Sequence, residues 1–198
     1  MFHVKHEGWT AADLSPVQVA ALEVFEGLLA AHAIPRGMVG SSDRDHIRER
    51  HVLDSLRAVP YLGSLKGPVV DLGSGAGLPG IPVAVARPDL LLTLVEPRQL
   101  RVAFLELAIG RLSLSNVRVS PRPAQELPPD AEACLARGFG DPSRTWEVAR
   151  GLLHADGSLI YWAGTTFRTD QVPEDARIAG IGSPTLESGG PIVIMTRQ

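Results

Sequence analysis

The chain has 198 residues, of which 44% are hydrophobic and 21% are charged, a balance that fits one globular domain and excludes fibrous and membrane-embedded classes. No continuous apolar run approaches the roughly 20 residues that cross a bilayer, so no membrane partner is expected. The net charge of −3 does not by itself indicate a nucleic-acid partner. The single cysteine, Cys134, cannot form an internal disulfide, and we therefore expect a cytoplasmic protein.

Two helices are expected before the first strand. Residues 15–33 begin with Ser15, a typical helix cap, and Pro16 suits the first helical position. Residues 43–59 carry apolar side chains on one face and arginines on the other. We expect residues 1–60 to form a helical extension packed on a domain made of residues 61–198.

After Gly63, short apolar runs alternate with helical stretches. Strands are expected at residues 68–72, 91–95, 117–119, 133–136, 158–162 and 192–196, and helices near residues 79–86, 98–112 and 143–154. This alternation is typical of a mainly parallel sheet with helices on both faces. The stretch 165–190 is rich in glycine, proline and charge, and its pattern predicts no element.

A glycine-rich loop follows the first expected strand. Glycines permit a tight turn and the close approach of a ligand, and open parallel sheets bind ligands at the carboxyl ends of their strands. We therefore expect a cofactor at this loop. The loop consists of Asp71, Gly73, Ser74, Gly75 and Gly77.

Two cofactors fit this loop. Residues 75–80 (GAGLPG) match the dinucleotide fingerprint, with Glu96 spaced as a ribose-binding acid and Pro97 beside it. However, a carboxylate at Asp71 would repel a pyrophosphate and attract the sulfonium and ammonium groups of S-adenosylmethionine. The spacing of Asp71 and the three glycines also resembles motif I of class I methyltransferases. S-adenosylmethionine is therefore favoured over a nicotinamide cofactor.

Three segments resemble the RsmG family, also called glucose-inhibited division protein B (GidB). They are residues 50–56 (RHVLDSL), 71–82 (DLGSGAGLPGIP) and 101–105 (RVAFL). The LPGIP extension is more specific than the general methyltransferase motif. Residues 36–40 (RGMVG) look like the form of this region in actinobacterial members, although the chain is divergent elsewhere.

The resemblance implies an α/β fold: a Rossmann-like class I methyltransferase domain with a mostly parallel seven-stranded sheet and N-terminal helices. It also implies methylation of guanine N7 in the 530 loop of 16S rRNA, either as naked RNA or in the small ribosomal subunit. At matching positions, Gly73 and Leu78 would contact the cofactor, Ala124 and Gln125 would flank its adenine, and Arg137 would lie at its methyl-bearing end.

Guanine N7 attacks with a lone pair and has no proton to lose. The reaction therefore needs alignment of the reactants, and we expect Arg137 to position them without a general base. We also expect a monomer.

The arginine-bearing helix face is a candidate RNA-binding surface, made of Arg44, Arg48, Arg50 and His51, with Arg57 further along. Acids such as Asp43 and Asp54 could pair with these arginines instead. No metal site is expected, because His3 and His6 have no further ligands nearby in the sequence.

The chain departs from the family pattern at three positions where many members carry basic residues: Leu100, Pro123 and Ala163. Two other interpretations therefore stay open. One is a small-molecule or protein methyltransferase that uses the same cofactor domain. The other is a non-catalytic relative that binds S-adenosylmethionine.

Overall fold

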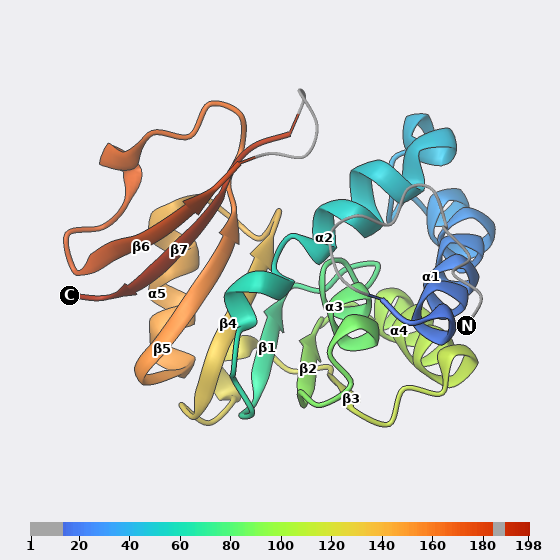
Figure 1. Cartoon of the computed structure of the whole chain (residues 1–198), viewed down its shortest axis with the longest axis horizontal. Coiled ribbons are helices and arrows are strands. Elements are labelled where there is room, and N and C mark those ends of the chain that lie inside the picture. Colours follow the sequence, from blue (N-terminus) through green and yellow to red (C-terminus); the bar gives the residue numbers. More distant parts are fainter. Residues whose placement is uncertain (1–13, 184–188) are drawn as a thin grey trace.

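Seven strands form one sheet in the order β3-β2-β1-β4-β5-β7-β6 (Figure 1). The structure is a computed structural model that describes residues 14–183 and 189–198. The strands are β1 (Val69–Leu72), β2 (Leu92–Val95), β3 (Val117–Ser120), β4 (Ala131–Arg137), β5 (Leu153–Trp162), β6 (Ala176–Gly182) and β7 (Ile192–Arg197). The first five pair in parallel, while β7 runs antiparallel between β5 and β6. The expected mostly parallel seven-stranded sheet is confirmed.

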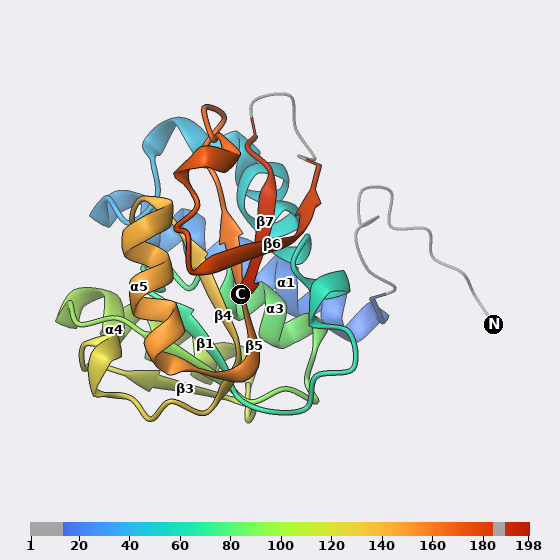
Figure 2. The ribbon, with the colours of Figure 1, turned by 90° about the vertical axis from the view of Figure 1, so that its left-hand side faces the viewer.

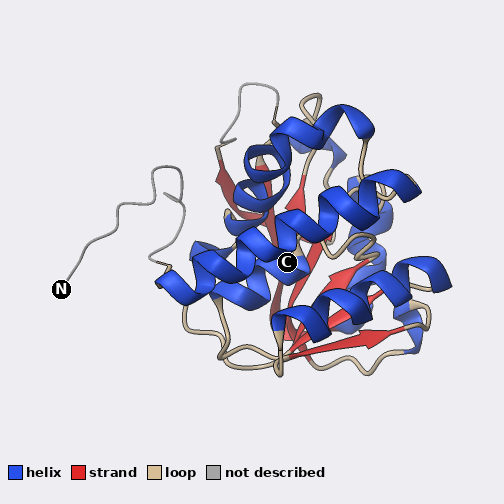
Figure 3. Cartoon of the chain, turned by 90° about the vertical axis from the view of Figure 1, so that its right-hand side faces the viewer, coloured by secondary structure: helices blue, strands red, loops and turns tan. Residues whose placement is uncertain are grey.

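Helices cover both faces of this sheet. They are α1 (Pro16–Leu28), α2 (Asp54–Leu56), α3 (Gly80–Ala86), α4 (Gln99–Leu112) and α5 (Pro142–Leu152). Helices α1, α3 and α4 share one apolar cluster, whereas α5 packs on the other face through Trp146 and Leu152. Figure 2 shows α5 and α3 on opposite sides of the strands, and Figure 3 shows helices in front of the strands from the other end of the molecule.

The first helix begins as its sequence predicts. The Ser15 side chain caps it, Gln18 completes a capping box, and a π turn (Leu29–Ala33) and a 3-10 turn (Ile34–Arg36) extend it to Gly37. The 21 residues of Pro16–Arg36 are long and apolar enough to cross a membrane, so the expectation that no stretch reaches this length is wrong by that measure. In the fold, fully buried side chains on one side of this helix pack into the core cluster shared with α3 and α4.

The second expected helix, 43–59, is wrong as one continuous element. It is divided into a 3-10 turn (Ser41–His46), a π turn (Arg48–Leu53), α2 and a further 3-10 turn (Val59–Leu62). Side chains from the sheet contact backbone carbonyls of this segment: Arg137 donates to Arg50 O at 3.5 Å, and Trp162 donates to Asp54 O at 3.1 Å. The local pattern does not contain these tertiary contacts, and tertiary context can override a local preference.

The C-terminal third departs most from the expected elements. Strand β5 begins at Leu153, five residues earlier than expected, and β6 was not expected at all. Strand β6 contains glycines, which are depleted in strands, and its alternate residues are exposed because successive side chains point to opposite faces of the sheet. Its pairing with β7, including a bulge between Ile178 and Gly180, determines its conformation.

Candidate functional site

The glycine loop leaves β1 as a tight turn. Gly73, Gly75 and Gly77 have positive φ angles of 64°, 57° and 80°, which other residues rarely adopt. A Cβ atom at Gly73 would lie 2.8 Å from the Phe139 ring, and one at Gly77 would lie within 2.9 Å of Ile81. At Gly75 the nearest atom would be 3.7 Å away. Only the Gly75 position in this loop therefore offers space that a ligand could fill.

Asp71 lies beneath this loop and is fully buried. Its Oδ2 accepts a hydrogen bond from Gly80 N at 3.2 Å, at the start of α3, while its Oδ1 has no partner among the described residues. Burial raises the pKa of Asp71 to about 7. A buried carboxylate with an unpaired oxygen is suited to a cationic ligand, as expected for S-adenosylmethionine, although the carboxylate lies behind the loop and not on its surface.

We expect Asp71→Asn to stabilise the protein relative to the wild type above pH 7 and much less at pH 5. The raised pKa means that the folded state binds a proton that the unfolded state has lost, so the wild type loses stability as pH rises from about 4 to 7. At about 1.4 kcal/mol per pH unit, this loss amounts to a few kcal/mol. Thermal melts of both proteins at pH 5 and pH 8 measure it; an equal difference at the two pH values would contradict the prediction.

Glu96 follows β2 and is 2% exposed. Its Oε2 accepts from Gly75 N at 3.1 Å and pairs with Arg101 Nη1 at 3.4 Å, and its Oε1 accepts from Arg98 N at 3.0 Å. The carboxylate is thus fixed directly against the glycine loop. Because a carboxylate can accept about four hydrogen bonds, it keeps capacity for ribose hydroxyls.

The other expected cofactor residues lie around the same end of the sheet. Leu78 is 7% exposed and Ala124 is 5% exposed, in a 3-10 turn (Ala124–Glu126) after β3. Pro97 and Gln125 are exposed. Their contacts with a cofactor stay predictions, but an orphaned carboxylate oxygen, open space at Gly75 and a fixed acid at Glu96 fit S-adenosylmethionine.

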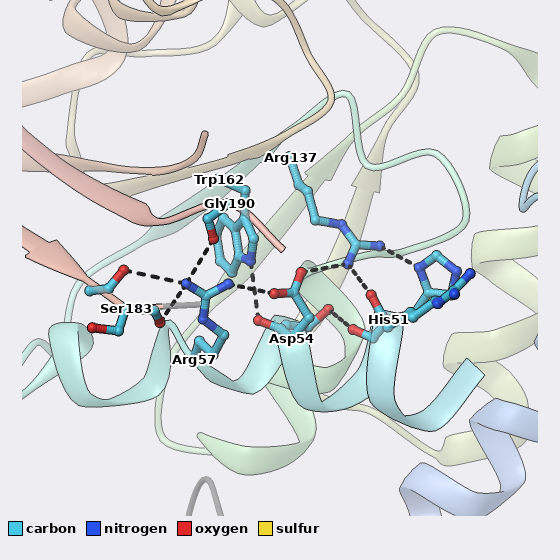
Figure 4. A network of polar contacts seen from close by, with 10 residues as sticks. His51, Asp54, Arg57, Arg137, Trp162, Ser183 and Gly190 are labelled. Carbon is cyan, nitrogen blue, oxygen red and sulfur yellow. Dashed lines mark hydrogen bonds and ion pairs between the residues drawn. The ribbon is translucent and has the colours of Figure 1, made fainter. Parts of the chain in front are cut away.

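Arg137 ends β4, the strand beside β1, and points toward the turn that leads into α2 (Figure 4). Its Nη1 pairs with Asp54 Oδ2 at 3.1 Å, and its Nη2 lies 3.2 Å from His51 Nδ1. The structure therefore brings together two expected site residues, Arg137 and His51, that lie far apart in the sequence. Asp54, the charged partner of Arg137, was expected from the sequence only as a possible partner of nearby arginines.

His51 is held as a neutral ring. A guanidinium can only donate, so His51 Nδ1 must accept from Arg137, and Nε2 then carries the proton toward Asp43 Oδ2 at 3.0 Å. Burial and the positive charge of Arg137 lower the pKa of His51 below its usual value. A neutral histidine with both nitrogens engaged is poorly placed to act as a general base.

A cavity of about 580 Å³ opens beside Arg137, at the carboxyl ends of β4 and β5. Trp162 and Tyr161 provide aromatic walls, and several glycines provide exposed backbone. Three arginines and one aspartate line it: Arg50, Arg57, Arg137 and Asp54. A planar group that carries or adjoins negative charge suits this lining.

Most of the expected RNA-binding residues are paired with acidic side chains. Arg48 makes two 2.9 Å hydrogen bonds to Glu26, and Arg50 pairs with Asp43 at 2.7 Å. Arg57 is 8% exposed, so its expected place on an RNA-binding face is wrong: it is buried against carbonyls of the β6–β7 hairpin. Arg44 is exposed and makes no ion pair with the described residues.

No cluster of metal-ligating side chains occurs in residues 14–183 and 189–198. His3 and His6 lie outside the described residues. No local sequence signal marks Asp54 as a link between elements, because its partners at positions 137 and 162 come from two strands far along the chain.

Comparison with known proteins connects this site to one family. Residues 18–182 match the family model described as GidB, rRNA small subunit methyltransferase G. A "Ribosomal RNA small subunit methyltransferase G" of Mycolicibacterium paratuberculosis is 31% identical over 81% of this chain and 74% of its own length. A relative with the same name from Salinispora tropica is 35% identical over 86% of this chain and 74% of its own length. Another, from Mycobacterium avium, is 33% identical over 76% of this chain and 63% of its own length.

Solved structures share the fold. A variant of MtNAS in complex with S-adenosylmethionine superposes with a TM-score of 0.65 at 15% identity, covering 91% of this chain and 76% of that one. Magnesium protoporphyrin IX methyltransferase from Synechocystis, with bound SAM, has a TM-score of 0.63 at 15% identity, covering 94% and 99%. Both similarities concern the Rossmann-like architecture alone.

Proposed function

The chain belongs to the GidB family of small-subunit rRNA methyltransferases, and on that premise we propose that it transfers a methyl group from S-adenosylmethionine to guanine N7 in the 530 loop of 16S rRNA. One observation carries the proposal. Arg137, which lines the cavity, ends β4, and β4 pairs with β1, the strand that leads into the glycine loop. We further propose that the enzyme is a cytoplasmic monomer in which residues 1–60 support a methyltransferase domain of residues 61–198.

The cofactor would be held at the carboxyl ends of β1 and β2. Gly75 leaves space for it, Asp71 lies buried beneath the loop and in its ionised form would favour a cationic ligand, and Glu96 would accept from its ribose. Gly73, Ser74, Gly77, Leu78, Pro97, Ala124 and Gln125 would complete the pocket. When bound, S-adenosylmethionine supplies the methyl group, and the sulfur takes the electron pair of the broken bond as guanine N7 forms the new one.

The cavity beside Arg137 would receive the guanine. Trp162 and Tyr161 offer apolar walls that exclude water, and the arginines offer charge to the flanking phosphate groups. Because N7 loses no proton, these residues need only bind and align the base. The neutral, fully engaged His51 agrees with a reaction that uses no general base.

The missing basic residues do not remove positive charge from the site. Ala163 lines the cavity, but Arg50, Arg57 and Arg137 line it as well. Leu100 is 58% exposed and borders a small groove that also contains Arg36 and His32. Arginines from other elements thus lie beside two of the three altered positions, which supports an active enzyme over a non-catalytic relative.

Arg44→Glu is expected to weaken RNA binding several-fold and to lower its salt dependence, because Arg44 is an exposed cation that could contact phosphate. Binding to a 530-loop RNA measured across a salt series would show both effects. Arg177→Glu, on edge strand β6 at the far end of the sheet from α1, is the matched control and should change binding much less (Figure 1). Equal effects of the two charge reversals on RNA affinity would contradict the proposal that Arg44 contacts RNA.

Methyl transfer from labelled S-adenosylmethionine tests the proposed function directly. Small subunits that lack the modification, naked 16S rRNA, bulk protein and a small-molecule extract are offered in parallel. Label at guanine N7 of the 530 loop is expected. Label in protein or in a small molecule would favour another methyltransferase, and cofactor binding without any transfer would favour a non-catalytic relative.

A further inference from the structure

Asp54 lies where two arginines and a tryptophan meet (Figure 4). Its Oδ2 accepts from Arg137 Nη1 at 3.1 Å and its Oδ1 accepts from Arg57 Nη1 at 2.6 Å. Its backbone oxygen accepts from Trp162 Nε1 at 3.1 Å. The Asp54 side chain is 16% exposed, so the negative charge of one largely buried carboxylate faces the positive charges of two guanidinium groups.

We propose that Asp54 is a positioning residue for methyl transfer, which holds the Arg137 guanidinium at the rim of the cavity and, through Arg57, holds the end of the β6–β7 hairpin that lines the same cavity. This inference rests on the proposed function, because Arg137 must contact the reactants for its position to matter.

Arg137 has no equivalent anchor among the described residues. Its contact with Arg50 O is long, at 3.5 Å, and its contact with His51 is to a neutral ring nitrogen. Asp54 is its one charged partner in residues 14–183 and 189–198. Because a charge-assisted hydrogen bond is roughly twice as strong as a neutral one, Asp54 decides the orientation of this long and otherwise flexible side chain.

Asp54 is also connected to the β6–β7 hairpin, through Arg57. Arg57 Nη2 donates to Ser183 O at 2.8 Å, to Gly190 O at 3.1 Å and to Gly182 O at 3.4 Å. These carbonyls belong to both sides of the hairpin, and Gly190 lines the cavity. Asp54 therefore connects two walls of the cavity that come from β4 and from the β6–β7 hairpin.

Asp54→Asn tests this role, since it keeps the side-chain shape and removes the charge. We expect kcat to fall about tenfold to 100-fold, the range for reactants misplaced by up to about 1 Å. In a background of Arg137→Gln, Asp54→Asn should lower kcat by a much smaller factor than it does in the wild type, because the Asp54–Arg137 interaction is already gone and only the contact with Arg57 is left to lose. Losses that multiply in the double variant would overturn the proposal.

A matched control separates positioning from folding. Asp175 also accepts from a tryptophan, Trp146 Nε1 at 3.0 Å, and from an arginine, Arg150 Nη1 at 3.0 Å, but it lies away from the cavity. Asp175→Asn should lower the melting temperature and leave kcat unchanged. Asp54→Glu retains the charge but places the carboxylate one methylene group further from the backbone, so it should still lower kcat about tenfold. A wild-type kcat in this variant would show that the position of the carboxylate does not affect methyl transfer.

The ionisation of His51 gives a readout that needs no methyl transfer. The positive charge of Arg137 lowers the pKa of His51 more than the negative charge of Asp54 raises it. If Asp54→Asn releases Arg137, the pKa of His51 must rise; if Arg137 stays in place, the pKa must fall because only the acid is lost. NMR titration of the His51 ring in the free protein distinguishes these results, and a fall or no change would overturn the proposal. Failure of wild-type protein to methylate RNA would instead overturn the proposed function.

Discussion

Gly75→Val should abolish binding of S-adenosylmethionine, lowering affinity by at least 100-fold. Valine at a φ of 57° is strained, and its branched side chain would occupy the one open position of the glycine loop. The same side chain would lie beside Gly75 N, which donates to Glu96, and so would disturb the acid expected to bind ribose. Calorimetric titration with S-adenosylmethionine and with its demethylated product measures the effect.

Gly37→Val is the matched control for this prediction. Gly37 has a φ of 66°, and a Cβ atom at this position would meet nothing within 4 Å, so valine there carries similar backbone strain outside the glycine loop. Both variants should lose stability by about 1–2 kcal/mol, the cost of a left-handed residue, and only Gly75→Val should lose the cofactor. Retained affinity in Gly75→Val would show that the cofactor does not lie against this loop.

Arg137→Ala should lower methyl transfer about 100-fold, because Arg137 is proposed to keep the reactants in line. The fold should survive, since Asp54 keeps Arg57 as a charged partner at 2.6 Å. Single-turnover rates with labelled cofactor measure the loss. Arg150→Ala, which removes an exposed arginine from a pair with Asp175, serves as the control and should leave the rate unchanged.

The pH dependence of the same reaction is expected to be flat from about neutral upward. Guanine N7 has no proton to lose, and His51, whose pKa is lowered by burial and by Arg137, is already neutral there. A steep rise toward basic pH that disappears on replacing one histidine would reveal a general base. The substrate atom would then be one that must lose a proton, and guanine N7 would be excluded.

The sequence predicted the parts of this protein that depend on local pattern. Strand–helix alternation and the glycine spacing placed β1, β2 and the cofactor loop within a residue or two. Strand β6 was not predicted because its short sequence contains two glycines, which are depleted in strands, and its conformation depends on pairing with β7. The single helix expected over 43–59 is irregular in a segment whose carbonyls accept from Arg137 and Trp162, and these long-range contacts are absent from the local pattern.

The same limit applies to the site. Glu96 could be named from its place after a strand, since strand ends meet at one edge of a parallel sheet, whereas Arg137 was named from the family resemblance. The burial of Arg57 could not, because its partners at 182, 183 and 190 lie more than a hundred residues further along the chain. The local sequence does not distinguish an arginine that faces solvent on a helix from one that, like Arg57, is buried against the carbonyls of a distant hairpin.

The hairpin that Arg57 contacts determines the order in which the glycine loop and the cavity can form during synthesis. Strand β7 is inserted between β5 and β6, although residues 192–197 are translated after both of them. The carbonyl of Gly190, which Arg57 binds, is likewise made long after Arg57 itself. A nascent chain can therefore form the glycine loop early, while the cavity beside Arg137 is completed only after Gly190 has been synthesised. Cofactor binding should precede competence for methyl transfer in the lifetime of each new molecule.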